Sequence, residues 1–453
     1  MADLVEARSI HIVGAGGAGM SGLAKLLAQA GHEVTGSDIK PARVLGTLRN
    51  LGVDTWVGHQ PDRMAAVDLV VASSAVPATD PELEAARRVG VDVWERPQLL
   101  AAITRSMPAL GVTGTHGKTT GSAMLVEALR SIGHDPSFMV GGELLGVGTN
   151  AHLGERGLFA LETDEAFGTF LDLRLSGLVV TNIEADHLDH YGTVGALEEA
   201  FADVAGRVDG PVVVCLDDEG SRRLHGSTPG AVGYGVAADA DWRIAEIEHR
   251  PGGIRFQLVH GGDAFRIDVA RPGLHVARNA AGVLALLGEV GLDVAAASEA
   301  LATFGGVHRR FEIRWSRDVM VVDDYAHHPT EVAATIEAAG LGHDGRIVAV
   351  FQPHRFTRTE EHATELGAVL GGADVVVVTD VYAAGEAPIP GVTGRVVADA
   401  VGEAAEVVYE PRRADVAQRV ADLVDRGDLV LVMGAGDITL VADELPALVA
   451  ARS

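Results

Sequence analysis

Short apolar runs alternate with longer stretches of helical periodicity along most of this sequence. The runs are rich in Val, Ile and Leu and show no apolar–polar alternation, which indicates strands that are buried on both faces. Such strands, separated by amphipathic helices, are typical of parallel sheets in α/β domains. We expect strands at Ile10–Val13, Leu69–Ala72, Ala109–Thr113, Leu178–Thr181, Pro211–Leu216, Met320–Asp323, Ile347–Phe351, Val375–Thr379 and Leu429–Met433.

One segment has a different pattern and helps to divide the chain. Residues Trp242–Val269 alternate apolar and polar positions, which predicts a few antiparallel strands added to a central domain. Two glycine-rich loops lie about 100 residues apart, and one sheet normally offers one such nucleotide-binding point. We therefore expect three α/β domains: a Rossmann-like domain at 1–107, a P-loop domain with the antiparallel addition at 108–315, and a second Rossmann-like domain at 316–453.

Composition narrows the possible functions. The 453 residues carry a formal net charge of −27, which disfavours nucleic acid and anionic membranes as partners. The single cysteine, Cys215, excludes an internal disulfide and a cysteine zinc cluster, and its apolar neighbours predict a buried structural role. The N-terminus does not resemble a signal peptide, and no apolar run approaches the ~18 residues of a membrane span. We expect a cytoplasmic protein.

The segment GVTGTHGKTT, from Gly111 to Thr120, follows an apolar strand and precedes a helical stretch. Its glycine spacing makes it a variant of the phosphate-binding loop, unless it is only a glycine-rich turn. Backbone N–H groups at the helix N-terminus can bind phosphates, Lys118 can reach the terminal phosphates of ATP, and the Thr119 hydroxyl can bind Mg²⁺. The predicted ATP-binding residues of this loop are Gly114, Thr115, His116, Gly117, Lys118, Thr119 and Thr120.

A second glycine-rich loop, GAGGAGMSG from Gly14 to Gly22, follows the first predicted strand. Asp38 ends a second short strand about 20 residues later, a spacing typical of dinucleotide-binding folds. A loop of this kind can bind NAD, FAD or the diphosphate of a nucleotide sugar. It can also serve only to pack a helix closely against a strand.

Acidic and histidine side chains follow two further apolar runs. Glu162 and Asp164 lie in LETDE, and TNIEADHLDHYGT supplies Asn182, Glu184, Asp186, His187, Asp189 and His190. Residues at the carboxyl ends of strands beside a phosphate loop are well placed to bind Mg²⁺. These segments therefore predict a metal site, although a lone histidine such as His187 is often structural.

The local cations that an acidic protein needs for anionic ligands cluster in three motifs. Arg309 and Arg310 lie in GVHRRFE. The other two motifs are DDYAHHPTEV, with Asp323, Asp324, Tyr325, His327 and His328, and FQPHRFTRT, with His354, Arg355 and Arg358. Prolines beside the strand ends favour ordered loops over a solvated surface.

Together these segments resemble the Mur ligase family of peptidoglycan synthesis. GTHGKTT, TNIEADHLD, LHVARNA, FGGVHRRFE, DDYAHHPTEV, FQPHRFTRT and MGAGDI occur in the order of the family and cover nearly the whole chain. GAGGAGMSG, the doubled histidine and FQPHRFTRT are most similar to the member that adds L-alanine to UDP-N-acetylmuramate. The resemblance implies an ATP- and Mg²⁺-dependent ligase that proceeds through an acyl phosphate and serves the cell wall, and with it cell shape and division.

The resemblance also implies roles for individual residues. It implies that the UDP-sugar is bound by Gly14, Ala15, Gly16, Gly17, Ala18, Gly19, Met20, Asp38 and Ser73. ATP is expected on the phosphate loop, with Asn279 towards the adenine, Arg310 on a phosphate and Asp324 on the ribose. The implied metal ligands are Thr119, Glu162 and His187. Tyr325, His327, His354, Arg355 and Arg358 are expected on the amino-acid and acyl-phosphate side, and the implied catalytic set is Lys118, His187, Arg310 and His327.

The chain departs from the family pattern at several positions. The usual Ser-Asp after the metal glutamate is replaced by Ala166 and Phe167. Ala202 occupies the place where several members have a carbamylated lysine, which the L-alanine-adding member also lacks.

Several alternatives stay open at this stage. They are a tripeptide-adding sibling ligase, a dehydrogenase that uses the first loop, and a non-catalytic nucleotide-binding relative. The general base could be His187 or His327, and the amino-acid substrate could be L-Ala, L-Ser or Gly. The protein could be a monomer or a homodimer.

Overall fold

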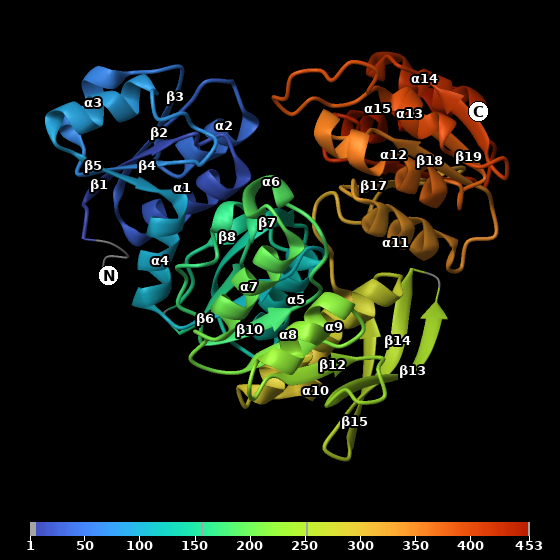
Figure 1. Cartoon of the computed structure of the whole chain (residues 1–453), viewed down its shortest axis with the longest axis horizontal. Coiled ribbons are helices and arrows are strands. Elements are labelled where there is room, and N and C mark those ends of the chain that lie inside the picture. Colours follow the sequence, from blue (N-terminus) through green and yellow to red (C-terminus); the bar gives the residue numbers. More distant parts are fainter. Residues whose placement is uncertain (1–5, 156, 251, 452–453) are drawn as a thin grey trace. The chain divides into compact units, whose positions relative to one another are not determined.

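The computed structural model describes residues 6–155, 157–250 and 252–451, and of Phe167 and Asp189 it describes only the backbone. Three sheets of five, ten and six strands, flanked by helices, confirm the α/β class (Figure 1). All nine strands expected from the apolar runs are present, with bounds that differ by at most one residue at either end. None of the helices within the described ranges is long and apolar enough to cross a membrane.

The described chain divides into two compact units. The first contains the chain up to Glu246 together with Phe256–Asp268 and Arg278–Gly305, and it includes the first sheet and most of the second. The second contains Ile247–Arg255, Val269–Ala277 and the chain from Gly306 onward, with the third sheet.

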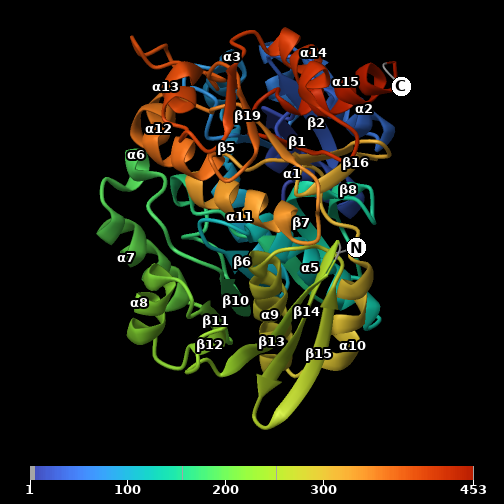
Figure 2. The same ribbon diagram turned by 90° about the vertical axis from the view of Figure 1, so that its right-hand side faces the viewer.

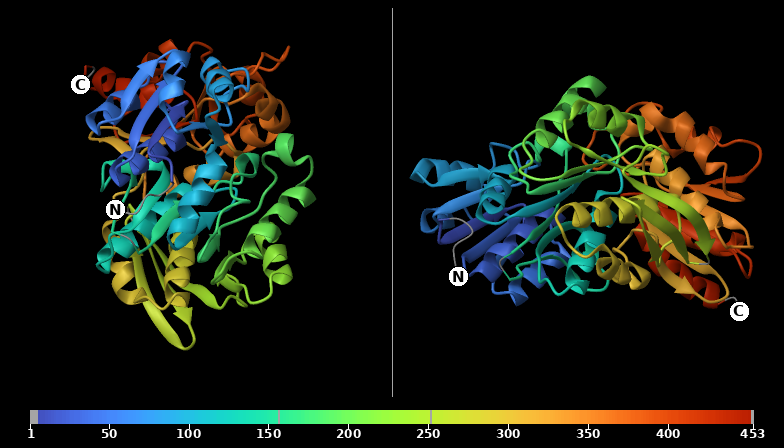
Figure 3. Two further views of the ribbon diagram at one scale, coloured as in Figure 1. Left: turned by 90° about the vertical axis from the view of Figure 1, so that its left-hand side faces the viewer. Right: turned by 90° about the horizontal axis from the view of Figure 1, so that it is seen from below.

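The N-terminal sheet, drawn in blue in Figure 3, is entirely parallel and has the order β3-β2-β1-β4-β5. Its strands are β1 (Ser9–Val13), β2 (Glu33–Asp38), β3 (Asp54–Val57), β4 (Leu69–Ala72) and β5 (Asp92–Glu95). Its helices are α1 (Ala18–Ala30), α2 (Arg43–Asn50), η1 (Pro61–Ala66), α3 (Pro81–Val89) and α4 (Arg96–Ser106). Because β1 lies between β2 and β4, the loop after β1 is flanked by the carboxyl ends of both neighbours.

The central sheet has the order β15-β14-β13-β12-β11-β10-β6-β9-β7-β8. Its strands are β6 (Ala109–Thr113), β7 (Ser137–Leu144), β8 (Thr149–His152), β9 (Phe159–Glu162), β10 (Gly177–Val180), β11 (Val212–Cys215), β12 (Val232–Gly235), β13 (Trp242–Arg250), β14 (Gly253–His260) and β15 (Asp263–Val269). Its helical segments are α5 (Lys118–Ser131), η2 (Ala166–Gly168), α6 (Leu188–Tyr191), α7 (Val194–Ala205), α8 (Glu219–Ser227), α9 (Leu274–Glu289), α10 (Val294–Ser298) and η3 (Glu299–Thr303). Cys215 on β11 is buried, as predicted.

The segment with alternating polarity forms the last three strands of this sheet, which run side by side in Figure 2. Only Gly261 and Gly262, both with positive φ, connect β14 to β15. A two-residue connection of this kind joins antiparallel strands, so the predicted antiparallel character holds for this pair.

The C-terminal sheet has the order β16-β17-β21-β18-β19-β20, with only the β16–β17 pair antiparallel. Its strands are β16 (Glu312–Ser316), β17 (Met320–Asp324), β18 (Ile347–Phe351), β19 (Val375–Val378), β20 (Glu406–Tyr409) and β21 (Leu429–Met433). Its helices are α11 (Pro329–Gly340), α12 (Phe356–Leu370), α13 (Gly394–Asp399), α14 (Arg413–Leu423) and α15 (Thr439–Ala450). Two separate apolar cores form, one against α11, α12 and α13 and the other against α14 and α15, so helices cover both faces.

Candidate active site

The phosphate loop lies where three parallel strands of the central sheet end. β6 is flanked by β9 and β10, so the loop after β6 meets the segments that carry the predicted acidic and histidine residues. The loop is bound to the segment after β10: Thr115 donates its N–H to the Asn182 carbonyl at 3.0 Å, and His116 donates its N–H to the Asn182 side chain at 2.8 Å. A methyl group at Gly114, whose φ is +129°, would lie 2.2 Å from Thr181 Oγ1, so this turn requires glycine.

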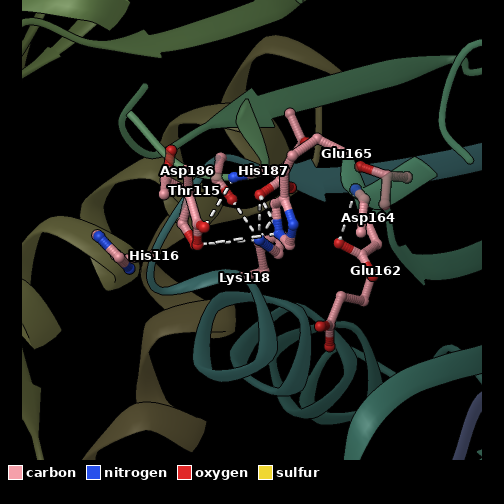
Figure 4. A network of polar contacts seen from close by, with 12 residues as sticks. Thr115, His116, Lys118, Glu162, Asp164, Glu165, Asp186 and His187 are labelled. Atoms are coloured by element: carbon pink, nitrogen blue, oxygen red, sulfur yellow. Dashed lines mark hydrogen bonds and ion pairs between the residues drawn. The ribbon is translucent and has the colours of Figure 1, made fainter. Parts of the chain in front are cut away.

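Lys118, the first residue of α5, is at the centre of this network (Figure 4). Its ammonium donates to the carbonyls of Gly114 at 2.7 Å and Thr115 at 3.0 Å, and to the carboxylate of Glu165 at 2.9 Å. Glu165 is buried, and only 13% of the lysine side chain is exposed. The predicted phosphate-binding lysine is therefore held by its own loop and by one buried carboxylate.

The charges around Lys118 shift the pKa values of both partners. Burial, reinforced by the charge of Asp164, raises the pKa of Glu165 to about 7, although Lys118 opposes the shift. Burial alone would lower the pKa of Lys118, but the carboxylates of Glu165 and Asp164 outweigh it and raise that pKa above its ordinary value. The lysine therefore stays cationic at neutral pH, as phosphate binding requires.

The predicted metal ligands lie beside the loop in two groups. The Thr119 hydroxyl donates to Glu162 Oε1 at 3.0 Å, and the other oxygen of Glu162 accepts the Gly141 N–H at 2.6 Å. His187 instead lies near Glu165, with 3.9 Å between His187 Nε2 and Glu165 Oε1. In Figure 4 the Glu162 side chain extends away from the group formed by Lys118, Glu165 and His187.

A second set of metal-ligand atoms contains two residues of the predicted metal-site segments, Asp164 and His187. Atoms of Asp164, Glu165 and His187 lie within 4.8 Å of one another and form a group that could hold an ion. The sequence interpretation assigned no role to Glu165, since a run of acidic residues does not show which carboxylate turns towards the lysine. A methyl group at Gly117 would lie 2.6 Å from Oδ1 of Asn279, so this buried amide packs directly on the loop.

The predicted nucleotide-sugar loop also lies at the carboxyl ends of parallel strands. Gly16 donates its N–H to Asp38 at 2.9 Å, and Gly14, with φ +83°, leaves room for Ser73, whose Cβ would lie 3.2 Å from a methyl group there. The remaining predicted residues form the loop and the first turn of α1: Ala15, Gly17, Ala18, Gly19 and Met20. The structure therefore brings all the residues predicted for this ligand to one edge of the sheet.

The second unit contains a cluster of aromatic and histidine rings after β17 and β18. The His327 ring lies 5.4 Å from the Tyr325 ring and 5.8 Å from the His354 ring, which stacks on Tyr382. Burial, followed by the charges of His327 and Arg358, lowers the pKa of His354 to about 4. His354 is therefore neutral at physiological pH.

Charged groups surround this ring cluster. The Arg310 guanidinium lies 5.0 Å from the centre of the Tyr325 ring and 3.8 Å from Glu331, and Arg355 donates to Glu386 at 2.5 Å. Asp324 is buried, and burial raises its pKa to about 6. Its two oxygens accept N–H groups of Phe311 and Ala326, each at 2.7 Å, so the carboxylate holds the backbone on both sides of Tyr325 and the segment of Phe311.

Models of known protein families match most of the chain. Residues 9–107 match the Mur ligase family catalytic domain, residues 112–287 the Mur ligase middle domain, and residues 309–436 the Mur ligase glutamate ligase domain. The UDP-N-acetylmuramate–L-alanine ligase of Mycolicibacterium vanbaalenii is 46% identical to this chain, over 99% of the chain and 98% of the relative. That of Kineococcus radiotolerans is also 46% identical, over 98% and 96%.

A solved structure has the same fold along the whole chain. The crystal structure of UDP-N-acetylmuramate-alanine ligase from Thermotoga maritima matches with a TM-score of 0.84 at 28% identity, and the match covers 98% of this chain and 100% of that one.

Proposed function

Because the chain belongs to the Mur ligase family, we propose that it joins L-alanine to the lactyl carboxylate of UDP-N-acetylmuramate and converts ATP to ADP and phosphate, in the synthesis of peptidoglycan precursors. The observation that carries this proposal is the 46% identity, over 99% of the chain, to a ligase with that name. The expected compartment is the cytoplasm, where ATP is available.

The chemistry begins with activation of an unreactive carboxylate. A carboxylate oxygen attacks the γ-phosphorus of ATP, the bond from that phosphorus to the bridging oxygen breaks, and ADP leaves. The alanine amine then attacks the carbonyl carbon of the acyl phosphate, loses a proton to a base, and phosphate departs as the tetrahedral intermediate collapses. The main demands on the protein are positioning and the offsetting of negative charge.

The phosphate loop supports this chemistry. Backbone N–H groups at the start of α5 would bind the phosphates of ATP, and the cationic Lys118 would offset charge on the γ-phosphoryl group. Its three N–H donors already have three partners, so to reach a phosphate the ammonium must exchange at least one of them, Gly114, Thr115 or Glu165. Asn279, packed on Gly117, would lie towards the adenine.

The donor set beside Lys118 fits a divalent cation. Mg²⁺ prefers oxygen ligands, and Thr119 with Glu162 supplies a hydroxyl and a carboxylate oxygen 3.0 Å apart. His187 lies with Asp164 and Glu165 in the other group of ligand atoms. When bound, Mg²⁺ would neutralise charge on the ATP phosphates. Thr119 and Glu162 are proposed to hold it from one group of ligand atoms, and His187 from the other.

The ring cluster of the second unit is proposed to serve the amino acid and the acyl phosphate. Arg310, Arg355 and Arg358 supply the positive charge that the carboxylate of L-alanine and the phosphate need. His354 is neutral at physiological pH, and its ring centre lies 5.8 Å from that of His327, so the two rings line one part of the cluster. His327 and His187 remain the candidates for accepting the amine proton, and Asp324 is proposed to contact the ribose of ATP.

Phosphate release tests the proposal directly. The purified protein is incubated with ATP and Mg²⁺, with UDP-N-acetylmuramate and L-alanine added singly and together. We expect release only with both substrates, together with one ADP and one amide product. Release with L-alanyl-γ-D-glutamyl-meso-diaminopimelate but not with L-alanine would identify the tripeptide-adding sibling instead. ATP binding without release in any mixture would support a non-catalytic relative.

A further inference from the structure

Arg96 is a cation at the nucleotide-sugar loop that belongs to none of the motifs described above. A methyl group at Gly19 would lie 2.9 Å from Cζ of Arg96, 3.0 Å from Nη1 and 3.2 Å from Nε. The guanidinium therefore packs on the backbone of the first turn of α1, and it fits there because residue 19 has no side chain.

The backbone around Arg96 is well fixed. Arg96 is the first residue of α4, directly after β5, and Glu95 and Gln98 form a capping box at this helix start, with Glu95 N–H donating to the Gln98 side chain at 2.7 Å. Because the N-terminal sheet is entirely parallel, the end of β5 lies at the same edge of the sheet as the loop after β1. The fold thus places Arg96 at the edge of the sheet where the nucleotide-sugar loop lies.

An anionic ligand at this loop would need a nearby positive charge. Residues 14–24 contain no lysine or arginine, and the nearest charge bonded to the loop is the carboxylate of Asp38, on the Gly16 N–H. Lys25, the first cation along α1, donates to Asn150 at 2.7 Å and to Thr149 at 3.2 Å instead. A diphosphate at this loop would face the N–H groups of α1 and a negative side chain, with Arg96 as the compensating charge.

The guanidinium of Arg96 also has a hydrogen-bond donor that a ligand could use. Within the described ranges of the chain, its buried Nε has no hydrogen-bond partner. A buried donor without a partner costs free energy. A phosphate would satisfy it, because guanidinium groups form bidentate hydrogen bonds to phosphate oxygens. We propose that Arg96 is a binding residue for the diphosphate of the UDP-sugar, holding it against the first turn of α1. This inference rests on the proposed function, since it requires a nucleotide sugar at this loop.

Ligand binding by the full-length protein tests the inference without catalysis. Titration calorimetry measures the affinities of UDP-N-acetylmuramate, UDP and uridine for the wild type, for Arg96→Gln and for Arg96→Lys. Arg105→Gln is the matched control, because it removes the same charge from an exposed position on the same helix. We expect Arg96→Gln to weaken UDP and UDP-N-acetylmuramate by about 10- to 100-fold, as for a lost hydrogen bond to a charged group. Arg96→Lys should recover part of this loss, and uridine, which lacks phosphate, should bind equally to all variants.

Three outcomes overturn the inference. The first is an unchanged UDP affinity in Arg96→Gln. The second is an equal loss of uridine affinity in Arg96→Gln, which would indicate a merely structural role. The third is an equal loss of UDP affinity in Arg105→Gln. A wild type that binds none of the three uridine ligands would instead defeat the proposed function. Gly19→Ala adds an independent check, because its methyl group must displace the guanidinium. It should weaken UDP binding in the wild type but much less in Arg96→Gln, since the two changes act on one contact.

Discussion

The ammonium of Lys118 lies 2.9 Å from the carboxylate of Glu165, and both groups are largely buried. The predicted phosphate-binding lysine thus has a carboxylate partner supplied by the segment after β9. Removing one partner of a buried ion pair leaves an uncompensated charge, and this loss exceeds the net contribution of the pair itself. Glu165 is therefore expected to fix the position of Lys118 and to stabilise the loop around it.

At a pH well above 7, where Glu165 is ionised, we expect Glu165→Gln and Lys118→Met each to lower the free energy of unfolding, by about 3–5 kcal/mol at most. The double variant should be more stable than the sum of the two effects predicts, because no charge is left unpaired. Glu165→Gln should also reduce kcat by at least about tenfold, since Lys118 loses its orientation. Urea denaturation and steady-state kinetics measure both effects, with the exposed Glu199→Gln as control. Wild-type stability together with wild-type kcat in Glu165→Gln would contradict this role.

The two groups of metal-ligand atoms make separable predictions for Mg²⁺. If Thr119 and Glu162 bind the ion, Glu162→Gln should raise the Mg²⁺ concentration for half-maximal activity by at least about tenfold at saturating ATP. Glu165→Gln should then lower kcat without a comparable shift in the Mg²⁺ requirement. The reverse result, with the larger shift in Glu165→Gln, would assign the ion to the group of Asp164, Glu165 and His187.

The strands that could be predicted from sequence are those buried on both faces. β18 and β21 are apolar throughout and fully buried, so their composition reveals them. β5 and β20 lie at sheet edges, begin with an acidic residue and are partly exposed, and neither was predicted. An edge strand needs no continuous apolar run, because only part of it packs in the core.

The same distinction applies to the residues of the candidate sites, which are predictable only where the sequence pattern records their position. The tight glycine turn after β6 was predictable because the close approach at Gly114 requires glycine, and a glycine pattern is visible in the sequence. The Lys118–Glu165 contact depends on the path of an irregular segment after β9, and no periodicity records that path. Arg96 was missed for a related reason: β5 brings it to the loop from about 80 residues further along the chain.

The low pKa of His354 predicts how the ring cluster titrates. We expect the imidazole of His354 to titrate near pH 4 by NMR, and its pKa to rise in His327→Asn and in Arg358→Gln, because each change removes positive charge. The rise should be partial in both variants, since burial is the largest cause. Arg395→Gln is the control, because that guanidinium lies over Tyr409 instead. Titration of His354 near pH 6.5 in the wild type would show that the ring is solvated.

Glu82 predicts how the stability of the first unit depends on pH. This carboxylate is fully buried among His11, Ser37 and Trp56, and it accepts the indole N–H of Trp56 at 3.0 Å and the N–H of Gln60 at 2.8 Å. Burial alone would raise the pKa of Glu82, but the hydrogen bonds from His11, Ser37 and Gln60 lower it to about 2.

A folded-state pKa below the unfolded value means that the folded protein binds fewer protons in this range. The stabilisation by Glu82 is therefore complete well above pH 4.5 and is lost as the pH falls towards 2. We expect Glu82→Gln to be less stable than the wild type by about 3 kcal/mol at pH 7 and by about 2 kcal/mol at pH 3.5, with the difference vanishing below pH 2. Urea denaturation across this range measures the difference, and the exposed Glu84→Gln on the same helix turn should show none. A difference that stays constant with pH would mean that Glu82 stabilises the fold by packing and not by its charge.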